Sequence, residues 1–262
     1  VEAQHWKAYL QKKIGTSLSQ GSLIGLWRDP WPGVVEGGTS YDVGLDRPHP
    51  GEAYRAGFVL VPVRSVDAVA RSFLAAEPSH RLAGALAWEA LRIEAGRPRR
   101  AREVDERAIP HELDWLRTAV HLTKGCYPGQ ETVARTLNLG RPPRRLTLLQ
   151  LDGLAGGLPA PGDVVRLGER AVGAVTSVAR HHELGPIALA LLRRGVPVEA
   201  VLSVEVSEAA GGPAPGERVV VGRVAAAQEV LVTPEGRAQA SPAERPGAGL
   251  RTSLLHRRDG GR

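Results

Sequence analysis

The feature that most limits the possible folds is a series of short β-type runs in the second half of the chain. The runs are rich in Val, Leu and Ala, and turn signals such as Pro161-Gly162-Asp163 separate them. Strands at this spacing are typical of a small β-barrel. Because Pro142-Pro143 marks a boundary, we expect a barrel domain over residues 142–233. The predicted strands are 146–151, 164–167, 171–178, 187–192, 201–206, 219–224 and 229–232.

Residues 25–141 have a different pattern. Apolar residues at three- and four-residue steps predict a helix over 82–95, and Gly96 followed by Pro98 is typical of a helix end. A helical part followed by a barrel predicts an α+β chain. The other predicted elements are loops and short extended pieces over 25–57, a β-type run over 58–63, and helices over 66–75 and 131–139.

The two ends of the chain differ in composition from its centre. Residues 1–24 hold three of the four lysines, so we expect a divergent N-terminal segment of separate origin. From Pro234 onward the sequence is Ala, Gly, Pro and Arg with little periodicity, which predicts a disordered tail over 234–262.

Composition excludes several classes of protein. The apolar runs are too short for a membrane-spanning helix, no secretory signal is visible, and one cysteine cannot form an internal disulfide, so we expect a cytoplasmic protein without a membrane partner. A single cysteine also excludes a zinc ribbon or a cluster held by four thiolates of this chain. The net charge of +6 could attract nucleic acid, but the arginines are scattered and no groove-reading motif accompanies them. We therefore expect no direct nucleic-acid partner.

The segment richest in possible chemistry is Lys124–Glu131, which reads Lys-Gly-Cys-Tyr-Pro-Gly-Gln-Glu. It places the only cysteine, Cys126, beside the only lysine outside the N-terminal segment and just before a predicted helix. A helix N-terminus and an ammonium group both favour the thiolate form of a cysteine. The alternative, given equal weight, is a buried and inert thiol in a tight turn.

Three other groups of residues could carry chemistry. Glu94, at the end of the helix over 82–95, is either a solvated carboxylate or an acceptor for two adjacent donors, such as N3–H and the 2-amino group of a pterin. Residues 103–105 and 109–112 include carboxylates and a histidine that could do acid–base work, although charged loop ends are commoner. The His-His-Glu cluster at 181–183 suggests a metal, but adjacent histidines on a strand point in different directions, so we expect no metal site.

The segment Lys124–Glu131 resembles the Lys-Gly-Cys-aromatic-x-Gly-Gln-Glu signature of the YgfZ family of folate-binding proteins. That family is related to the T-protein (GcvT, aminomethyltransferase) of the glycine cleavage system. The resemblance covers about residues 25–232. Other segments similar to the family or to T-proteins are 91–96 (an Arg-x-Glu-x-Gly stretch), 109–112 (Ile-Pro-x-Glu), 173–177 and 184–190.

This resemblance implies an aminomethyltransferase-like α/β folate-binding module over 25–141, followed by the barrel. Family members surround a central folate-binding hole with three domains and assist iron–sulfur cluster assembly or repair, through which they are linked to tRNA modification. The resemblance therefore implies tetrahydrofolate as the cofactor and iron–sulfur enzymes or assembly proteins as partners. We expect a monomer with no independent turnover.

The resemblance also assigns site residues position by position. Cys126 and Lys124 match the reactive part of the signature. Glu94 matches the T-protein glutamate that faces the pterin, with Arg92 in the same stretch. The remaining expected folate-binding residues are Tyr127, Gln130 and Glu131.

Two alternatives stay open at this point. A tetrahydrofolate-dependent aminomethyltransferase shares the Arg-x-Glu-x-Gly stretch and the barrel, although typical T-proteins lack the cysteine signature. The family also begins with a substantial first domain, where this chain has the divergent residues 1–24. We therefore expect an N-terminally truncated member, and a non-functional fragment is the second alternative.

Overall fold

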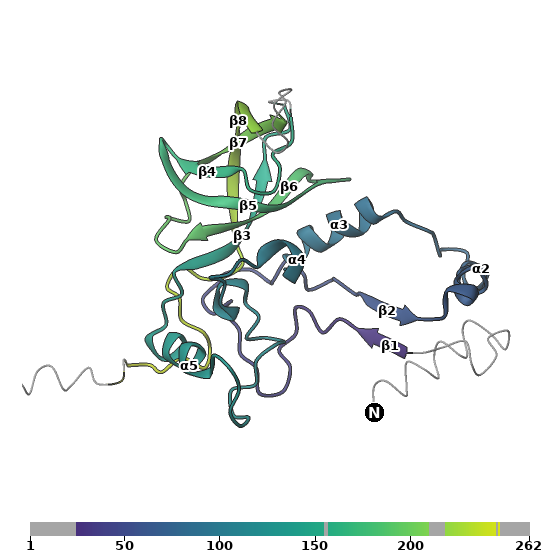
Figure 1. Cartoon of the computed structure of the whole chain (residues 1–262), viewed down its shortest axis with the longest axis horizontal. Coiled ribbons are helices and arrows are strands. Elements are labelled where there is room, and N and C mark those ends of the chain that lie inside the picture. Colours follow the sequence, from purple (N-terminus) through teal and green to yellow (C-terminus); the bar gives the residue numbers. More distant parts are fainter. Residues whose placement is uncertain (1–24, 155–156, 210–217, 245, 247–262) are drawn as a thin grey trace, which may run out of the picture.

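The computed structural model describes residues 25–154, 157–209, 218–244 and 246. They form a closed six-stranded barrel, at the top of Figure 1, and a part made of helices, loops and a two-stranded sheet below it. The expected α+β composition with a small barrel in the second half of the chain is confirmed. The divergent segment 1–24 lies outside the described residues.

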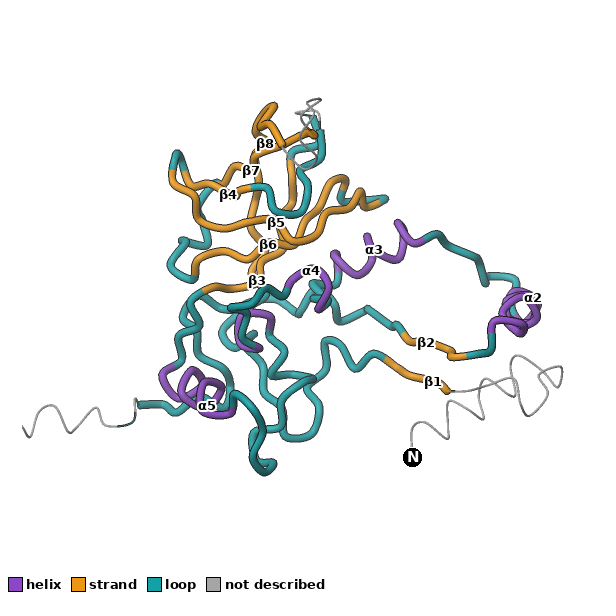
Figure 2. Tube along the Cα trace, in the orientation of Figure 1, coloured by secondary structure: helices purple, strands orange, loops and turns teal. Residues whose placement is uncertain are grey.

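The barrel strands pair antiparallel in the order β3-β6-β5-β4-β7-β8, and β8 closes the barrel onto β3. Figure 2 shows them as the orange segments of the upper part. The strands are β3 (Arg144–Leu151), β4 (Val164–Leu167), β5 (Arg170–His181), β6 (Gly185–Arg193), β7 (Leu202–Ala209) and β8 (Arg218–Val230).

The last strand corrects the sequence prediction. Two strands were expected over 219–224 and 229–232, but the single strand β8 covers all of the first and the first half of the second. The alanines in its centre lack the bulk that marks a strand in a hydrophobicity pattern. They nevertheless keep the pairing, because Ala226 lies opposite Leu151 on β3 and opposite Leu202 on β7. Ala226 is buried in the barrel core, where a small interior accepts a small side chain.

The part below the barrel confirms the three predicted helices. The longest predicted one begins at Ala85 instead of residue 82, directly after Gly84, and ends at Glu94. A short antiparallel pair of strands, β1 and β2, precedes these helices in the chain. The elements are β1 (Gly25–Arg28), β2 (Gly57–Leu60), the 3-10 turn η1 (Val63–Ser65), α2 (Val66–Ala76), α3 (Ala85–Glu94), α4 (Arg100–Glu103), the 3-10 turn η2 (Pro110–Leu113) and α5 (Gln130–Leu139).

Strand β3 is apolar on both faces because it belongs to two cores. Leu149 and Leu151 contribute to the barrel interior. Successive side chains on a strand point to opposite faces, so Leu146 and Leu148 lie on the outside of the barrel. There they join a second core that includes Ile93 of α3 and residues of η2 and α5. This second core holds the end of α3 against the barrel.

The beginning of the predicted disordered tail is part of this second core. Residues 234–244 run back along the helical part, where the backbone N–H of Gln239 donates to the carbonyl of Ser40 at 3.0 Å. The hydroxyl of Ser241 donates to the carbonyl of Leu137 at 2.8 Å, and Ala238 is buried between these contacts. These backbone contacts order a sequence that has no periodicity of its own. Residues 247–262 lie outside the described residues.

Candidate functional site

The cysteine segment forms an exposed loop and the first turn of α5. Gly129 has a left-handed φ of 84° and precedes the helix, and Gln130 and Glu131 are its first two residues. Tyr127 is partly buried against the second core. The ammonium of Lys124 lies 5.1 Å from the centre of the Tyr127 ring, so a cation–π contact holds the lysine over the tyrosine.

The thiol of Cys126 is exposed. The structure therefore excludes the alternative of a buried, inert cysteine. A Cβ atom added at Gly125 or at Gly129 would meet no atom within 4 Å. Of these two glycines, only Gly129 has a positive φ. The fold itself does not require glycine at position 125, and the backbone on both sides of the thiol is open to close approach by another molecule.

Glu94 is the last residue of α3 and its carboxylate is 39% exposed. Its Oε2 atom lies 3.2 Å from Nε2 of His181, which ends strand β5 and is itself buried. The Nδ1 atom of His181 accepts the backbone N–H groups of Glu183 at 3.2 Å and of Leu184 at 3.1 Å. One face of the Glu94 carboxylate is thus occupied by a barrel residue, and the other remains accessible.

A cleft of about 760 Å³ separates α3 from β5. Its walls are mainly apolar, with Leu86 and Leu91 on the helix side and Val178 on the strand side. His181 also lines this cleft, so the partner of Glu94 belongs to its wall. Exposed Arg180 adds a positive charge to the same wall. A flat apolar group could occupy the cleft beside this cation. The carboxylate among the lining residues is Glu89, which pairs with Arg92, whereas Glu94 reaches the cleft wall only through its contact with His181.

Arg92 has a different environment although it is on the same helix. Its side chain is only 3% exposed, and its guanidinium donates to Glu89 at 2.5 Å, to the carbonyl of Arg97 at 2.6 Å and to Ser177 at 2.7 Å. It also lies 3.5 Å from the buried carboxylate of Glu103. These contacts make Arg92 a link between α3 and the barrel. Its expected part in folate binding stays a prediction.

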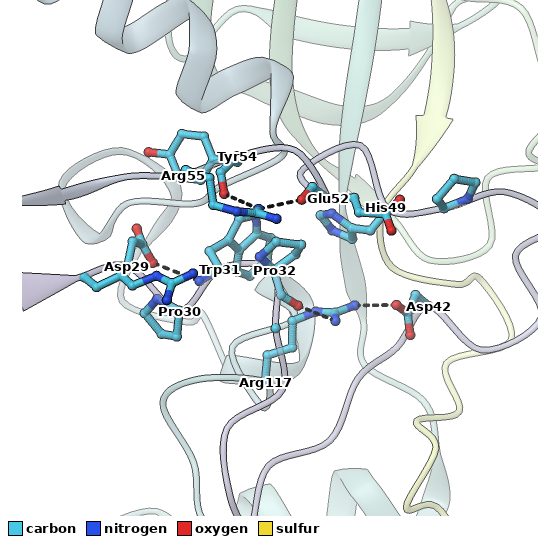
Figure 3. A pocket seen from close by; sticks show the side chains of 13 residues that line it. Asp29, Pro30, Trp31, Pro32, Asp42, His49, Glu52, Tyr54, Arg55 and Arg117 are labelled. Carbon is cyan, nitrogen blue, oxygen red and sulfur yellow. Dashed lines mark hydrogen bonds and ion pairs between the residues drawn. The ribbon is translucent and has the colours of Figure 1, made fainter. Parts of the chain in front are cut away.

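A second cavity, of about 610 Å³, lies among the loops of residues 28–55 and Arg117 (Figure 3). The buried Trp31 lines it, and the indole N–H of Trp31 donates to the carbonyl of Ala95 at 2.8 Å. Arg117 pairs with Asp42 at 2.8 Å across the cavity wall. Because Ala95 directly follows Glu94, this cavity lies close to the end of α3. Its walls come from segments that the sequence predicted only as loops.

The charges that line this second cavity are largely paired within the protein. The guanidinium of Arg117 holds the pKa of Asp42 below its usual value despite partial burial. Burial lowers the pKa of His49 to about 4, so this imidazole is neutral at pH 7. Arg55 is exposed, and its Nη1 donates to the carbonyls of Glu52 and Tyr54. The cavity is lined by the exposed guanidinium groups of Arg28 and Arg55 and by groups that are fixed by internal bonds.

The structure separates the predicted residues into two groups. Figure 1 shows α5, which follows the cysteine loop, well apart from α3, which carries Arg92 and Glu94. No hydrogen bond or ion pair within the described residues joins Lys124–Glu131 to either residue. The exposed thiol and the candidate pterin carboxylate are thus two separate sites on the same core.

The other polar groups singled out in the sequence stabilise the fold. Arg144 of β3 binds the carboxylates of Asp105 and Glu112, at 2.5 Å and 2.8 Å, and holds the pKa of Asp105 at about 2. His111 is fully buried, with its ring 6.0 Å from that of Tyr41. Across the described ranges, no three His, Cys, Asp or Glu residues gather as metal ligands.

Sequence reasoning missed two features of the site. It considered His181 only as a metal ligand, whereas the structure brings it to Glu94. It treated Trp31 as a loop residue, whereas the indole fixes the backbone after α3. No local signal could have found these contacts, because each joins segments far apart in the chain. In the described part of the chain, no helix has both the length and the apolar composition needed to cross a bilayer.

Comparison with known sequences gives two relatives. A protein of Edwardsiella ictaluri named tRNA-modifying protein YgfZ is 37% identical over 150 residues, which cover 53% of this chain and 43% of the relative. A candidate chloroplastic transferase of Arabidopsis thaliana is 37% identical over 94 residues, which cover 36% of this chain and 21% of that protein. The chain therefore spans less than half the length of either curated relative. No family profile matches the chain.

Among solved structures, the glycine cleavage system aminomethyltransferase T from Bartonella henselae is similar to this chain with a TM-score of 0.48 and 20% sequence identity. The alignment covers 72% of this chain and 49% of that chain.

Proposed function

We propose that this chain, which is 37% identical over 150 residues to a bacterial protein named YgfZ, is a folate-binding accessory protein that supports iron–sulfur cluster assembly or repair, without turnover of its own. The observation that carries the proposal is the half-exposed carboxylate of Glu94, which does not itself line the apolar α3–β5 cleft but lies 3.2 Å from His181 in the wall of that cleft. Tetrahydrofolate is the proposed ligand. The link to tRNA modification, which the name of the bacterial relative carries, would run through the iron–sulfur enzymes that the protein supports.

The cleft supports this proposal through its chemistry. A pterin is a flat ring that presents N3–H and a 2-amino group side by side, and a carboxylate accepts both at once. We propose that Glu94, which contacts His181 of the cleft wall without lining the cleft, supplies that carboxylate, and that the apolar walls remove the ring from water. The exposed guanidinium of Arg180 on the same wall is the proposed partner of the negatively charged glutamate tail of the folate.

The cysteine loop supports the accessory role. A lone exposed thiol cannot hold a cluster, but it can contact one held by a partner protein. The open backbone at Gly125 allows such a partner to approach the thiol of Cys126 closely. We propose that this loop is the face toward iron–sulfur enzymes or assembly proteins, with Lys124 held beside it by Tyr127.

Calorimetric titration with tetrahydrofolate tests the ligand. We expect the wild-type protein to bind and Glu94→Ala to bind at least about tenfold more weakly, as the loss of a charge-assisted bidentate contact predicts. Glu183→Ala is the matched control, because this carboxylate is exposed and is 3.7 Å from His182 instead of facing His181. Equal affinities of wild type and Glu94→Ala would remove the pterin assignment, and no binding by the wild type would remove the folate function.

A genetic test addresses the accessory role separately. The protein and its Cys126→Ser variant would be expressed in a strain that lacks its own family member, and the activity of an iron–sulfur enzyme would be measured. We expect restoration by the wild type and not by the variant. Formation of methylenetetrahydrofolate by the purified protein in a glycine cleavage assay would instead support the aminomethyltransferase alternative.

A further inference from the structure

Two cavities of the structure share the same pair of arginines. The cavity of about 610 Å³ among the loops (Figure 3), which we call the loop cavity, is lined by Arg28 and Arg55. A cavity of about 270 Å³, which we call the strand cavity, is lined by the same two arginines and by residues of β1 and β2. We infer that this region binds a small organic anion, with its charged group at the shared arginines and its apolar body in the strand cavity. Neither arginine belongs to the proposed folate site.

The strand cavity has mainly apolar walls beside a cation. Leu26 of β1 lies opposite Val59 of β2 in the antiparallel register, and both line the cavity. Arg28 lies opposite Gly57 in the same register. Side chains two positions apart on a strand point to the same face, so Leu26 and Arg28 lie on one side of the two-stranded sheet. An apolar pair and a guanidinium therefore adjoin each other on that face.

Gly57 keeps the position opposite Arg28 free of a side chain. A Cβ atom at this position would lie 2.7 Å from the carbonyl oxygen of Trp27, which is closer than a real Cβ contact allows. Glycine at this position therefore permits the close approach of the two strands. Because it contributes no side chain, the strand cavity stays open beside the guanidinium of Arg28.

The guanidinium of Arg55 is a cation that its own loop holds in place. Its Nη1 donates to the carbonyl of Glu52 at 2.6 Å and to that of Tyr54 at 2.9 Å. Among the described residues, no carboxylate lies within ion-pair distance of this guanidinium, and Nε and Nη2 donate to no other group. Nε and Nη2 form one edge of the guanidinium, which can bind an oxyanion through two parallel hydrogen bonds. The loop thus presents an oriented donor pair for an anion.

The acidic residues of the loop cavity leave this charge available. Asp29 and Asp42 are each paired with another arginine, at 2.8 Å in both cases. Glu52 is exposed and has no cationic partner among the described residues, and the charge of an exposed carboxylate is screened by solvent. An anion that approaches Arg55 therefore displaces no existing ion pair of that arginine.

These features define the ligand by its chemistry as a carboxylate or a phosphate joined to an apolar body. The apolar walls formed by Leu26 and Val59 remove the body from water, and the shared arginines bind the charged group. A ligand with only one of these two parts would use only part of the site.

Calorimetric titration with matched probes tests the site. Octanoate and octyl phosphate carry a charged head and an apolar tail, acetate and inorganic phosphate carry the head alone, and 1-octanol carries the tail alone. We expect at least one of the two long anions to bind at least about tenfold more tightly than each of the other three probes, which forgo either the burial of the tail or the hydrogen bonds of the head. The tighter of the two long anions identifies the head as carboxylate or phosphate.

Substitutions locate the bound anion. We expect Arg55→Gln to bind the tighter long anion at least about tenfold more weakly, because it loses a bidentate contact to a charged group. Arg71→Gln is the matched control and should bind as the wild type does, because Arg71 of α2 is exposed and lines neither cavity. Val59→Thr replaces a methyl group of the apolar wall with a hydroxyl, so we expect about fourfold weaker binding of the long anion.

Two results would overturn the inference directly. One is a wild-type protein that binds neither octanoate nor octyl phosphate. The other is equal affinity of Arg55→Gln and Arg71→Gln, which would show that net charge attracts the anion and not a site.

Tetrahydrofolate separates this site from the proposed folate site. We expect it to leave the binding of the long anion unchanged, and we expect Glu94→Ala to bind that anion as the wild type does. Failure of the folate proposal would therefore not affect this result. Displacement of the long anion by tetrahydrofolate would show that the shared arginines belong to the folate site, and the inference of a separate ligand would be wrong.

Discussion

The guanidinium of Arg92 donates a 2.7 Å hydrogen bond to the hydroxyl of Ser177, and this contact joins helix α3 to barrel strand β5. The Ser177 hydroxyl donates in turn to the carboxylate of Glu103 at 2.5 Å. That carboxylate also accepts the hydroxyl of Thr176 at 3.0 Å and the backbone N–H of Arg99 at 2.7 Å. A buried cation and a buried anion from different helices thus meet on one strand of the barrel, although Nε of Arg92 has no hydrogen-bond partner among the described residues.

Removal of the cation from this network should destabilise the fold. We expect Arg92→Met to lower the free energy of unfolding by about 3 kcal/mol, because it leaves the buried Glu103 carboxylate without its counter-charge. Urea denaturation followed by circular dichroism measures the change. The double variant Arg92→Met, Glu103→Gln should recover part of the loss, because no unpaired charge remains. A stable Arg92→Met protein with weakened folate binding would instead identify Arg92 as a ligand residue.

The comparison between sequence and structure shows which interactions are local. Helix α3 could be predicted because its apolar spacing and the glycine that follows it are properties of adjacent residues. The contact between Glu94 and His181 could not, because it depends on how the barrel is placed against the end of the helix. In the same way, Cys126 was recognised from its neighbours, but whether it is buried or exposed depends on packing outside the motif.

The barrel shows a second limit of local reasoning. Its turn signals predicted the strand positions well, but the alanine-rich centre of β8 was taken for a break. Closure of a barrel supplies neighbours on both sides of a strand, and these pairings hold residues that have little strand preference themselves. Residues 235–244 follow the same principle, because Gln239 and Ser241 are held by hydrogen bonds to the carbonyls of Ser40 and Leu137.

The exposed thiol of Cys126 should react in the folded protein. We expect alkylation by iodoacetamide at neutral pH in native buffer, at a rate similar to that in urea, because no part of the described fold covers the sulfur. Mass spectrometry follows the addition of one label, and Cys126→Ser provides the unlabelled control because the chain has no other cysteine. Protection that disappears only upon unfolding would contradict the exposed position of the loop.

The buried imidazole of His111 should make the fold sensitive to mild acid. Burial lowers its pKa from 6.5 to about 4, so the folded protein keeps it neutral while the unfolded chain takes up a proton. The unfolded state therefore binds more protons between these pH values, and stability falls as the pH drops from 6.5 to 4. At about 1.4 kcal/mol for each pKa unit, this histidine accounts for a loss of about 3 kcal/mol.

Urea denaturation at a series of pH values measures this loss. His49 has a similarly lowered pKa, also through burial, and contributes to the same pH range. We therefore expect His111→Phe, which keeps a ring against Tyr41, to remove about 3 kcal/mol of the acid-dependent loss relative to wild type, while His49 continues to contribute. Burial raises the pKa of the Asp114 carboxyl to about 7, so this group opposes the histidines over the same pH range. The test is therefore the difference between wild type and His111→Phe at each pH, whereas Asp105, with a pKa of about 2, acts at lower pH. An unchanged pH dependence in His111→Phe would show that this ring is not buried as a neutral group.

Gly96 and Gly129 form a matched pair that separates backbone strain from crowding. Both have left-handed backbone angles, with φ of 60° and 84°. A Cβ atom at Gly129 would meet nothing within 4 Å, whereas one at Gly96 would lie 2.7 Å from Cδ2 of Leu231, a buried residue of the second core. We expect Gly129→Ala to lower the free energy of unfolding by about 1 kcal/mol, the cost of the left-handed conformation alone. We expect Gly96→Ala to lower it by about 3 kcal/mol, because Leu231 must also move. Urea denaturation of the two variants tests the difference, and equal losses would mean that Leu231 adjusts without cost and that the turn after α3 is not held against the core.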